Sequence, residues 1–65
     1  MRQAPENVVV VIPVFQPGDQ FPELLAALAQ VPYRAIVVVN DGSGPDFDAC
    51  FQRAARIPRV ELVEQ

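Results

Sequence analysis

The run Ala-Ile-Val-Val-Val-Asn at residues 35–40 constrains the fold more than any other part of the sequence. It is apolar at consecutive positions and rich in β-branched residues, so it predicts a strand buried on both faces. Such strands are typical of parallel sheets covered by helices. Asp41, Gly42 and Ser43 follow directly. Because ligands bind just past the carboxyl ends of the strands in these sheets, the three residues are candidates for a binding site.

The sequence on either side predicts a Rossmann-like βαβαβ half-domain, an α/β fold with a three-stranded parallel sheet. Amphipathic spacing predicts the helices, Asp19 is the expected N-cap of the first, and Pro13 is expected to end the first strand. The third strand alternates polar and apolar residues, which is typical of a half-exposed edge strand or of a strand whose second face is covered only by sequence outside this chain. The expected strands are 7–13, 35–40 and 59–64, and the expected helices are 20–30 and 45–56.

Composition narrows the classes of function. The chain has 65 residues, no His and a net charge of −3, which argues against nucleic acid as a partner because phosphate binding needs a basic surface. Without His, neither a Ser-His-Asp nor a Cys-His nucleophile can be assembled within the chain. A single Cys50 excludes an internal disulfide and fits a reducing compartment. A zinc site is not expected from one Cys and no His.

A binding constellation is predicted where the first two strands end. Asp41 and Phe15 follow adjacent strand tips, so a carboxylate that accepts hydrogen bonds and a ring that stacks would lie beside the backbone of Pro13. Gly42 and Ser43 would let the backbone turn sharply and approach a ligand. Two plainer interpretations stay open at this point. The pattern supports a turn-capping role for Asp41 as well as it supports a ligand-binding role. For Phe15, the pattern alone favours packing in the core over stacking on a ligand.

The acids of this region favour one kind of ligand over another. A bare phosphate at the start of the second predicted helix would face Asp41, Asp46 and Asp48, whose charges oppose it. The glycine-rich phosphate signatures G-x-G-x-x-G and G-x-x-x-x-G-K-[ST] are both absent from the sequence. We therefore expect the loop to bind a nucleoside or a sugar, or to share a cation, rather than to cradle a phosphate.

Two segments together resemble the start of a family 2 glycosyltransferase with the GT-A fold. Residues 9–15, Val-Val-Val-Ile-Pro-Val-Phe, are similar to the strand that ends I-P-x-Y/F-N in that family. Residues 36–43, Ile-Val-Val-Val-Asn-Asp-Gly-Ser, are similar to its V-V-D-D-G-S segment. Residues 59–65 resemble its third strand. The chain departs from the pattern at Asn40, which stands for the first acid of the pair, and at Gln16, which stands for an asparagine.

The resemblance implies a nucleotide-binding role for five residues. Asp41 would bind the nucleobase, Phe15 would lie against it, and the backbone of Pro13 would line the nucleoside pocket, with Gly42 and Ser43 beside them. The donor substrate would be a nucleotide-diphosphate sugar, and the acceptor is unknown. No catalytic or metal-binding residue is expected within the chain, since Asp46-Phe47-Asp48 has the letters D-x-D but lies in a helix start.

The resemblance also carries expectations about the whole enzyme. The D-x-D motif and the catalytic base of the family lie further along than residue 65, so residues 1–65 are expected to be the N-terminal part of a nucleotide-sugar-binding domain, inactive by itself. A divalent cation, Mg or Mn, is expected only in the full-length parent. The setting would be the cytoplasm or the cytoplasmic face of a membrane, with any membrane association made through sequence outside this chain.

Two other classes of function remain as alternatives. A receiver-like or flavodoxin-like signalling module would place strand-tip acids around a metal and a phosphoryl group, but it needs a second acid beside Asp41 and a lysine, and the chain has no Lys. The other alternative is an inactive structural fragment that self-associates through open sheet edges.

Overall fold

The computed structural model describes residues 4–64, which form an α/β unit with a three-stranded parallel sheet. The strands lie in the order β1-β2-β3, and a short 3₁₀ turn at Pro5–Asn7 precedes the first. The expected fold class is confirmed, and every predicted strand is present to within two residues. The strands are β1 (Val9–Val14), β2 (Ala35–Asn40) and β3 (Val60–Glu64).

The two helices of residues 4–64 are shorter than the sequence predicts. The first, α1, spans Phe21–Leu28, and the second, α2, spans Asp48–Ala55 after a separate 3₁₀ turn at Pro45–Phe47. The expectation that Asp19 caps α1 is wrong, because Gln20 occupies the N-cap position and makes no side-chain cap hydrogen bond. A proline lies in the first turn of α1, where its missing N–H leaves no helical bond unmade.

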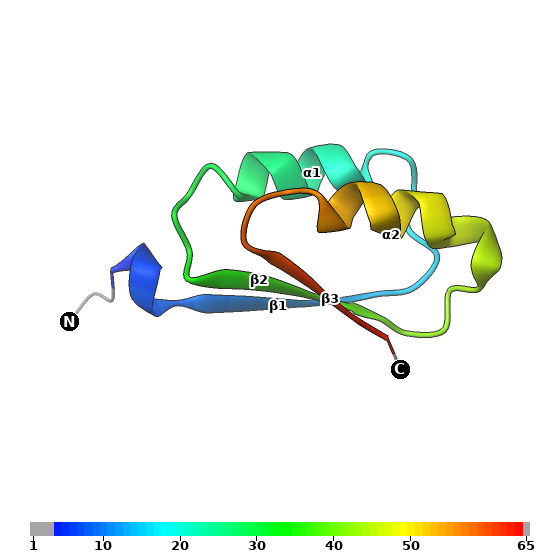
Figure 1. The fold of residues 1–65 in the computed structure, drawn as a ribbon, viewed down its shortest axis with the longest axis horizontal. Coiled ribbons are helices and arrows are strands. Elements are labelled where there is room, and N and C mark those ends of the chain that lie inside the picture. Colours follow the sequence, from blue (N-terminus) through cyan, green and yellow to red (C-terminus); the bar gives the residue numbers. More distant parts are fainter. Residues whose placement is uncertain (1–3, 65) are drawn as a thin grey trace.

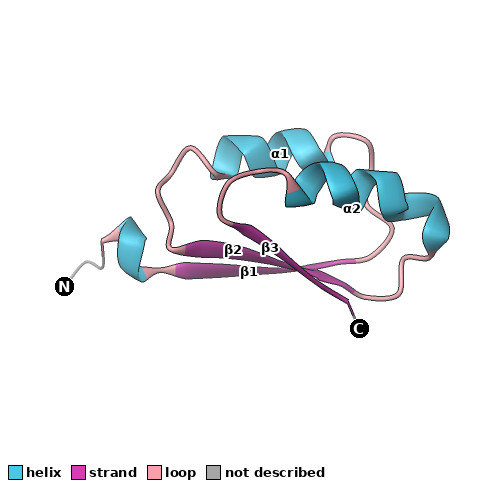
Figure 2. Cartoon of the chain, viewed as in Figure 1, coloured by secondary structure: helices cyan, strands magenta, loops and turns pink. Residues whose placement is uncertain are grey.

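Both helices pack on the same face of the sheet (Figures 1 and 2). Right-handed crossovers give this result when each new strand is added on the same side of the previous one. Between the helices and the sheet, the rings of Phe21 and Phe51 meet edge to face with their centroids 6.3 Å apart. The buried apolar core comprises Val14, Leu25, Ile36, Val38, Phe51 and Ala54.

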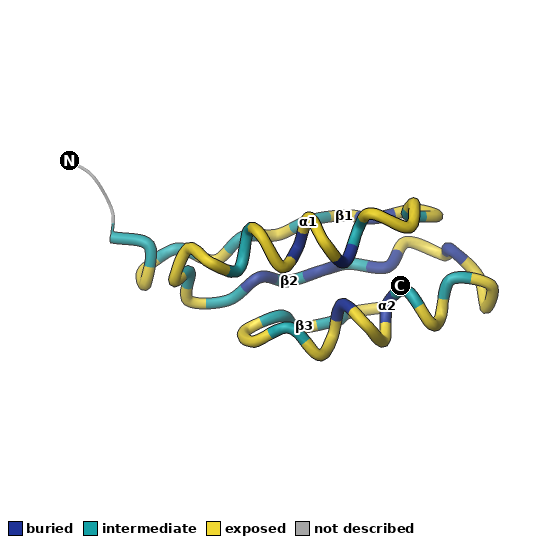
Figure 3. The backbone as a smooth tube through the Cα atoms, turned by 90° about the horizontal axis from the view of Figure 1, so that it is seen from above, coloured by how far each residue is buried: buried dark blue, intermediate teal, exposed yellow. Residues whose placement is uncertain are grey.

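The opposite face of the sheet is open within residues 4–64, and here the sequence-based expectation is wrong. The continuous apolar run predicts burial of β2 on both faces, yet only Ile36 and Val38 are buried among its apolar residues, while Val37 and Val39 are half-buried. On β1, Val11 is 61% exposed. Burial changes from residue to residue along β2 (Figure 3) because the described helices cover only one side of the sheet (Figure 1). Side chains at alternate strand positions point to opposite faces.

Pro13 lies inside β1 rather than at its end, because β1 is an edge strand. The carbonyls of Val8 and Val14 accept hydrogen bonds from Arg34 and Asp41, so even-numbered residues turn their backbone groups toward β2. The missing N–H of Pro13 therefore falls on the open edge, where no ladder bond is lost. Within residues 4–64, β3 lies at the opposite edge of the sheet, in agreement with the first of the two interpretations of its alternating pattern.

Candidate functional site

The tips of β1 and β2 are joined by two hydrogen bonds past the ends of the strands. The Asp41 N–H donates to the Val14 carbonyl at 2.9 Å, and the Gln16 N–H donates to Ser43 Oγ at 2.7 Å. The chain after β2 turns through two glycines with positive φ, 73° at Gly42 and 91° at Gly44. An L side chain at either position would be strained, so the glycines permit the path of this loop.

The side chain of Asn40 stabilises the same loop through a hydrogen bond. Its Oδ1 accepts the Ser43 N–H at 3.0 Å, and the two residues are only 7% and 5% exposed. Short polar side chains commonly fix turns by accepting a hydrogen bond from the backbone a few residues ahead. Asn40, for which the resemblance to the glycosyltransferases gives no clear role, thus positions the Gly42-Ser43 turn.

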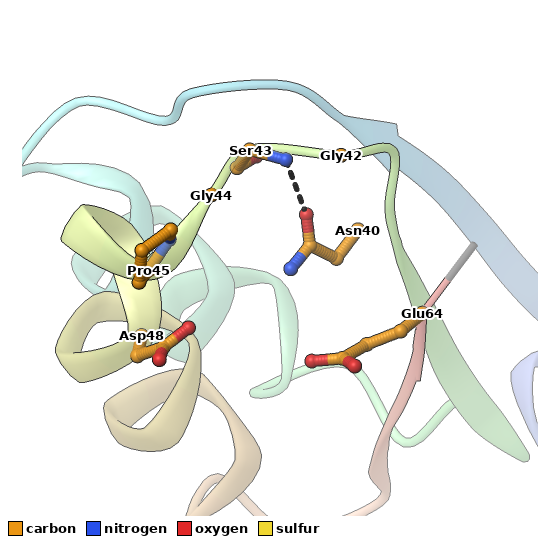
Figure 4. Close-up of a pocket in the computed structure, with 7 residues that line it drawn as sticks. All are labelled: Asn40, Gly42, Ser43, Gly44, Pro45, Asp48 and Glu64. Atoms are coloured by element: carbon orange, nitrogen blue, oxygen red, sulfur yellow. Dashed lines mark hydrogen bonds between the residues drawn. The ribbon is translucent and has the colours of Figure 1, made fainter.

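The other end of the Asn40 side chain is free. Within residues 4–64, its amide nitrogen donates no hydrogen bond to another group of the protein. No fully buried side-chain nitrogen or oxygen in these residues lacks a hydrogen-bond partner. Because the Asn40 amide nitrogen has no partner, it is not fully buried, and solvent can reach it. Figure 4 shows it pointing toward the space between the loop, α2 and β3.

That space is a hollow of about 320 Å³ at the carboxyl ends of β2 and β3. Asp48 reaches it from the first residue of α2, and Glu64 reaches it from the tip of β3, directly beside Asn40 in the sheet register. Their carboxylates face the hollow from opposite sides, with the Asn40 amide between and above them (Figure 4). The lining residues are Asn40, Gly42, Ser43, Gly44, Pro45, Asp48 and Glu64.

Negative charge gathers at this end of the sheet. Asp41 and Asp46 lie in the connection from β2 to α2, so with Asp48 and Glu64 four carboxylates surround the loop and the hollow. All four residues are exposed, so water moderates the repulsion between their charges. The field of such a rim disfavours an anion and favours a neutral or cationic group that can donate hydrogen bonds.

Only two of the five residues that the sequence predicts to bind a nucleotide line the hollow. Gly42 and Ser43 line the hollow, whereas Pro13, Phe15 and Asp41 do not. Phe15 is 62% exposed at the tip of β1, so its interpretation as a core residue is wrong. Asp41 and Phe15 nevertheless follow strand tips that the Asp41 N–H links, so they lie at the same carboxyl edge of the sheet as the hollow.

Sequence reasoning missed three polar groups of the hollow, those of Asn40, Asp48 and Glu64. A signal existed for two of them. An Asn at the end of a strand, three residues before a Ser, indicates a side-chain-stabilised turn. Parallel alignment of residues 35–40 with 59–64 places Glu64 beside Asn40. The sequence places Asp48 only in a helix start, and its inward direction depends on the 3₁₀ turn at Pro45–Phe47, which the sequence did not predict.

Comparison of the chain with models of known protein families, with characterised proteins and with solved structures found no match. Within residues 4–64, no three acidic, His or Cys side chains converge as a metal site would require, and the divalent cation that the resemblance implies is expected outside these residues. Neither described helix has the length and apolar character needed to cross a membrane.

Proposed function

We propose that this chain binds the nucleotide of a nucleotide-diphosphate sugar and is the nucleotide-binding part of a glycosyltransferase. One observation carries the proposal: a polar hollow at the carboxyl ends of two parallel strands, with the free amide nitrogen of buried Asn40 pointing into it. In open α/β sheets this end of the strands is where ligands bind. The volume of the hollow, about 320 Å³, is within the range of small-molecule sites.

The resemblance of residues 9–15 and 36–43 to family 2 glycosyltransferases supplies the class of ligand. In that proposal Gly42 and Ser43 form the turn against which the nucleoside lies, and Asp41 and Phe15 complete the rim. Exposure of both side chains supports this role, because a ligand can reach them without any rearrangement of the core. The proposal carries with it a cytoplasmic setting, to which the free thiol of Cys50 is suited.

The sugar-transfer step is not assigned to any residue between 4 and 64. The carboxylates of Asp48 and Glu64 line the hollow, but no described group is placed as a general base beside a sugar acceptor. The proposed role of the chain is therefore to bind and orient a donor nucleotide. Transfer, and the metal site expected for it, belong to the parent enzyme.

Calorimetric titration of the chain with UDP, GDP and ADP tests the proposal. We expect at least one nucleotide to bind, and we expect Asn40→Ala and Asp41→Ala each to weaken that binding about tenfold through loss of a polar contact. Gln52→Ala is the matched control, since it removes an exposed amide that does not line the hollow. Binding of none of the three nucleotides would overturn the proposal.

A further inference from the structure

The free edge of β1 carries no polar side chain and holds backbone groups without partners. Every residue of Val9–Val14 is apolar, and Val9 and Val11 are 47% and 61% exposed. Odd-numbered residues of β1 turn their backbone groups away from β2, so the N–H and C=O groups of Val9 and Val11 have no partner within residues 4–64. An exposed apolar strand edge of this kind is a template for pairing with another strand.

An apolar groove lies beside this edge, between β1 and α1. Its volume is about 250 Å³, and its lining residues are Ile12, Phe21, Leu24, Leu25 and Leu28. None of them belongs to β2 or α2, so the groove is on the side of α1 that faces away from the centre of the sheet. Figure 3 shows α1 on the β1 side of the sheet and α2 on the β3 side. Leu24, at 65% exposed, leaves a large apolar side chain in water at this groove.

We propose that two copies of this chain associate through their β1 edges, which pair antiparallel about a two-fold axis at Val11 and join the two sheets into one. Directly opposite residues of paired strands point to the same face, so α1 of both copies lies on one side of the joined sheet and the two apolar grooves adjoin. The inference does not depend on the nucleotide site, which lies at the ends of β2 and β3.

The sequence of β1 fits this register. With Val11 opposite the Val11 of the second copy, each donates its N–H to the carbonyl of the other, as a hydrogen-bonded pair of an antiparallel ladder does. Val9 then lies opposite Pro13 and donates its N–H to the Pro13 carbonyl. Pro13 lacks only the donor, so both valine N–H groups of each copy are paired, and only the Val9 carbonyl is left to water. The proline therefore permits the pairing.

Charge favours an antiparallel second copy. Arg34 and Arg59 lie at the amino end of the sheet, and Asp19 and Asp41 follow the tips of β1 and β2 at the carboxyl end. An antiparallel copy places its basic end beside the acidic end of the first, whereas a parallel copy would place like charges together. Glu6, just before β1, is an acid at the amino end and weakens this effect, but the two arginines outnumber it.

The other free edge, that of β3, is less suited to pairing. Glu61 and Glu64 lie on this strand, and charged side chains on an edge strand oppose the addition of a further strand. Pairing of β3 with its own copy would also bring these carboxylates together. Pairing of β1 with β3 is head-to-tail and builds an open filament, whereas pairing of β1 with β1 closes as a dimer.

Sedimentation velocity of the chain over a concentration series tests the proposal. We expect a reversible dimer of the 7.1 kDa chain. Leu24→Glu places a carboxylate in each groove, and Val11→Pro removes an N–H that has no partner in the single copy, so each should weaken dimerisation at least about tenfold. Val63→Lys is the control, because Val63 is 45% exposed on β3, and it should leave the dimer unchanged. Far-UV circular dichroism checks that each variant is folded.

Single cysteines in a Cys50→Ser background test the register. Val11→Cys should form an intermolecular disulfide under a mild oxidant, because the Cα atoms of a hydrogen-bonded pair lie about 5.5 Å apart, within the span of a disulfide. Val9→Cys should not, since its copy would lie about 14 Å away along the strand.

Three results would overturn the proposal. The first is a chain that stays monomeric at every concentration. The second is a dimer that Val63→Lys abolishes and Leu24→Glu preserves, because such a dimer would form through the open face of the sheet. The third is a series of larger assemblies in place of a dimer. Cross-linking of Val9→Cys without cross-linking of Val11→Cys would overturn the two-fold axis at Val11.

Discussion

The two ends of the sheet share one backbone geometry but differ in how their polar groups are used. At the amino end, the Arg59 guanidinium donates to the carbonyls of Ala29 and Val31, just past the end of α1. The Arg59 carbonyl in turn accepts the Ile36 N–H at 2.9 Å, at the start of β2. At the carboxyl end, the donor of Asn40 and the acceptors of Asp48 and Glu64 face an open hollow.

The charges follow the same division. Arg34, Arg56 and Arg59 lie in the connections at the amino end, and Asp41 and Asp46 lie in the connection at the carboxyl end. A cation beside helix carbonyls complements the helix dipole and satisfies groups that would otherwise lack partners. Polar groups that already pair within the protein stabilise it, and polar groups left unpaired in a hollow are available to a ligand. From this difference we propose a structural role for one end and a binding role for the other.

The largest expected effect is on the core that both ends share. Ile36 is fully buried in the central strand, so Ile36→Ala should lower the free energy of unfolding by about 2–5 kcal/mol. Val11→Ala, on the open face of the sheet, should cost less than about 0.5 kcal/mol, as exposed substitutions usually do. Urea unfolding of the two variants measures both values. Equal losses would show that the two faces of the sheet are equally buried in solution.

Asn40→Ala should have the next largest effect on stability, because the Asn40 side chain holds the loop after β2 as well as lining the proposed binding hollow. The variant leaves the Ser43 N–H without its acceptor, which should cost about 1–3 kcal/mol of unfolding free energy. Gln52→Ala provides the reference for loss of an exposed amide and should change stability by less than about 0.5 kcal/mol. If Asn40→Ala proves as stable as its reference, the side chain does not hold the Gly42-Ser43 turn.

Much of the fold, but less of the site, follows from the sequence. Unbroken β-branched residues and the alternating pattern of residues 59–64 identify three strands and the edge position of β3, because these signals are local. The open face was not foreseen, since an apolar run does not say what covers it. The Asn40, Asp48 and Glu64 cluster joins three elements, so it depends on strand register and on the 3₁₀ turn at Pro45–Phe47. Those features arise from packing rather than from local preference.

A substitution at the amino end should separate stability from binding. Arg59→Ala removes the hydrogen bonds to the carbonyls of Ala29 and Val31. Residue 59 has a φ of 68°, and since alanine also carries a Cβ, the backbone strain there is similar in the variant and in the original protein. We expect a loss of about 1 kcal/mol in unfolding free energy and no change in nucleotide affinity. A large loss of affinity with Arg59→Ala would contradict the division of roles between the two ends.

Phe15→Ala should affect stability least. The ring is 62% exposed, so its removal should change the free energy of unfolding by less than about 0.5 kcal/mol. If the ring stacks on the nucleotide, as the family resemblance implies, the affinity should fall by about threefold or more, which corresponds to the contribution of an aromatic contact. Phe15→Leu controls for loss of apolar surface. Unchanged affinity in Phe15→Ala would remove Phe15 from the binding site.

The most direct test of the binding role is an amide chemical-shift map of the chain titrated with a nucleotide. We predict that the largest changes fall on the Asn40 side-chain amide and on the backbone amides of Gly42, Ser43, Gly44 and Glu64, while the amides of Arg34 and Arg59 at the amino end stay unchanged. Saturating changes confined to the amino end or to the open face of the sheet, or no changes at any nucleotide concentration, would contradict the account.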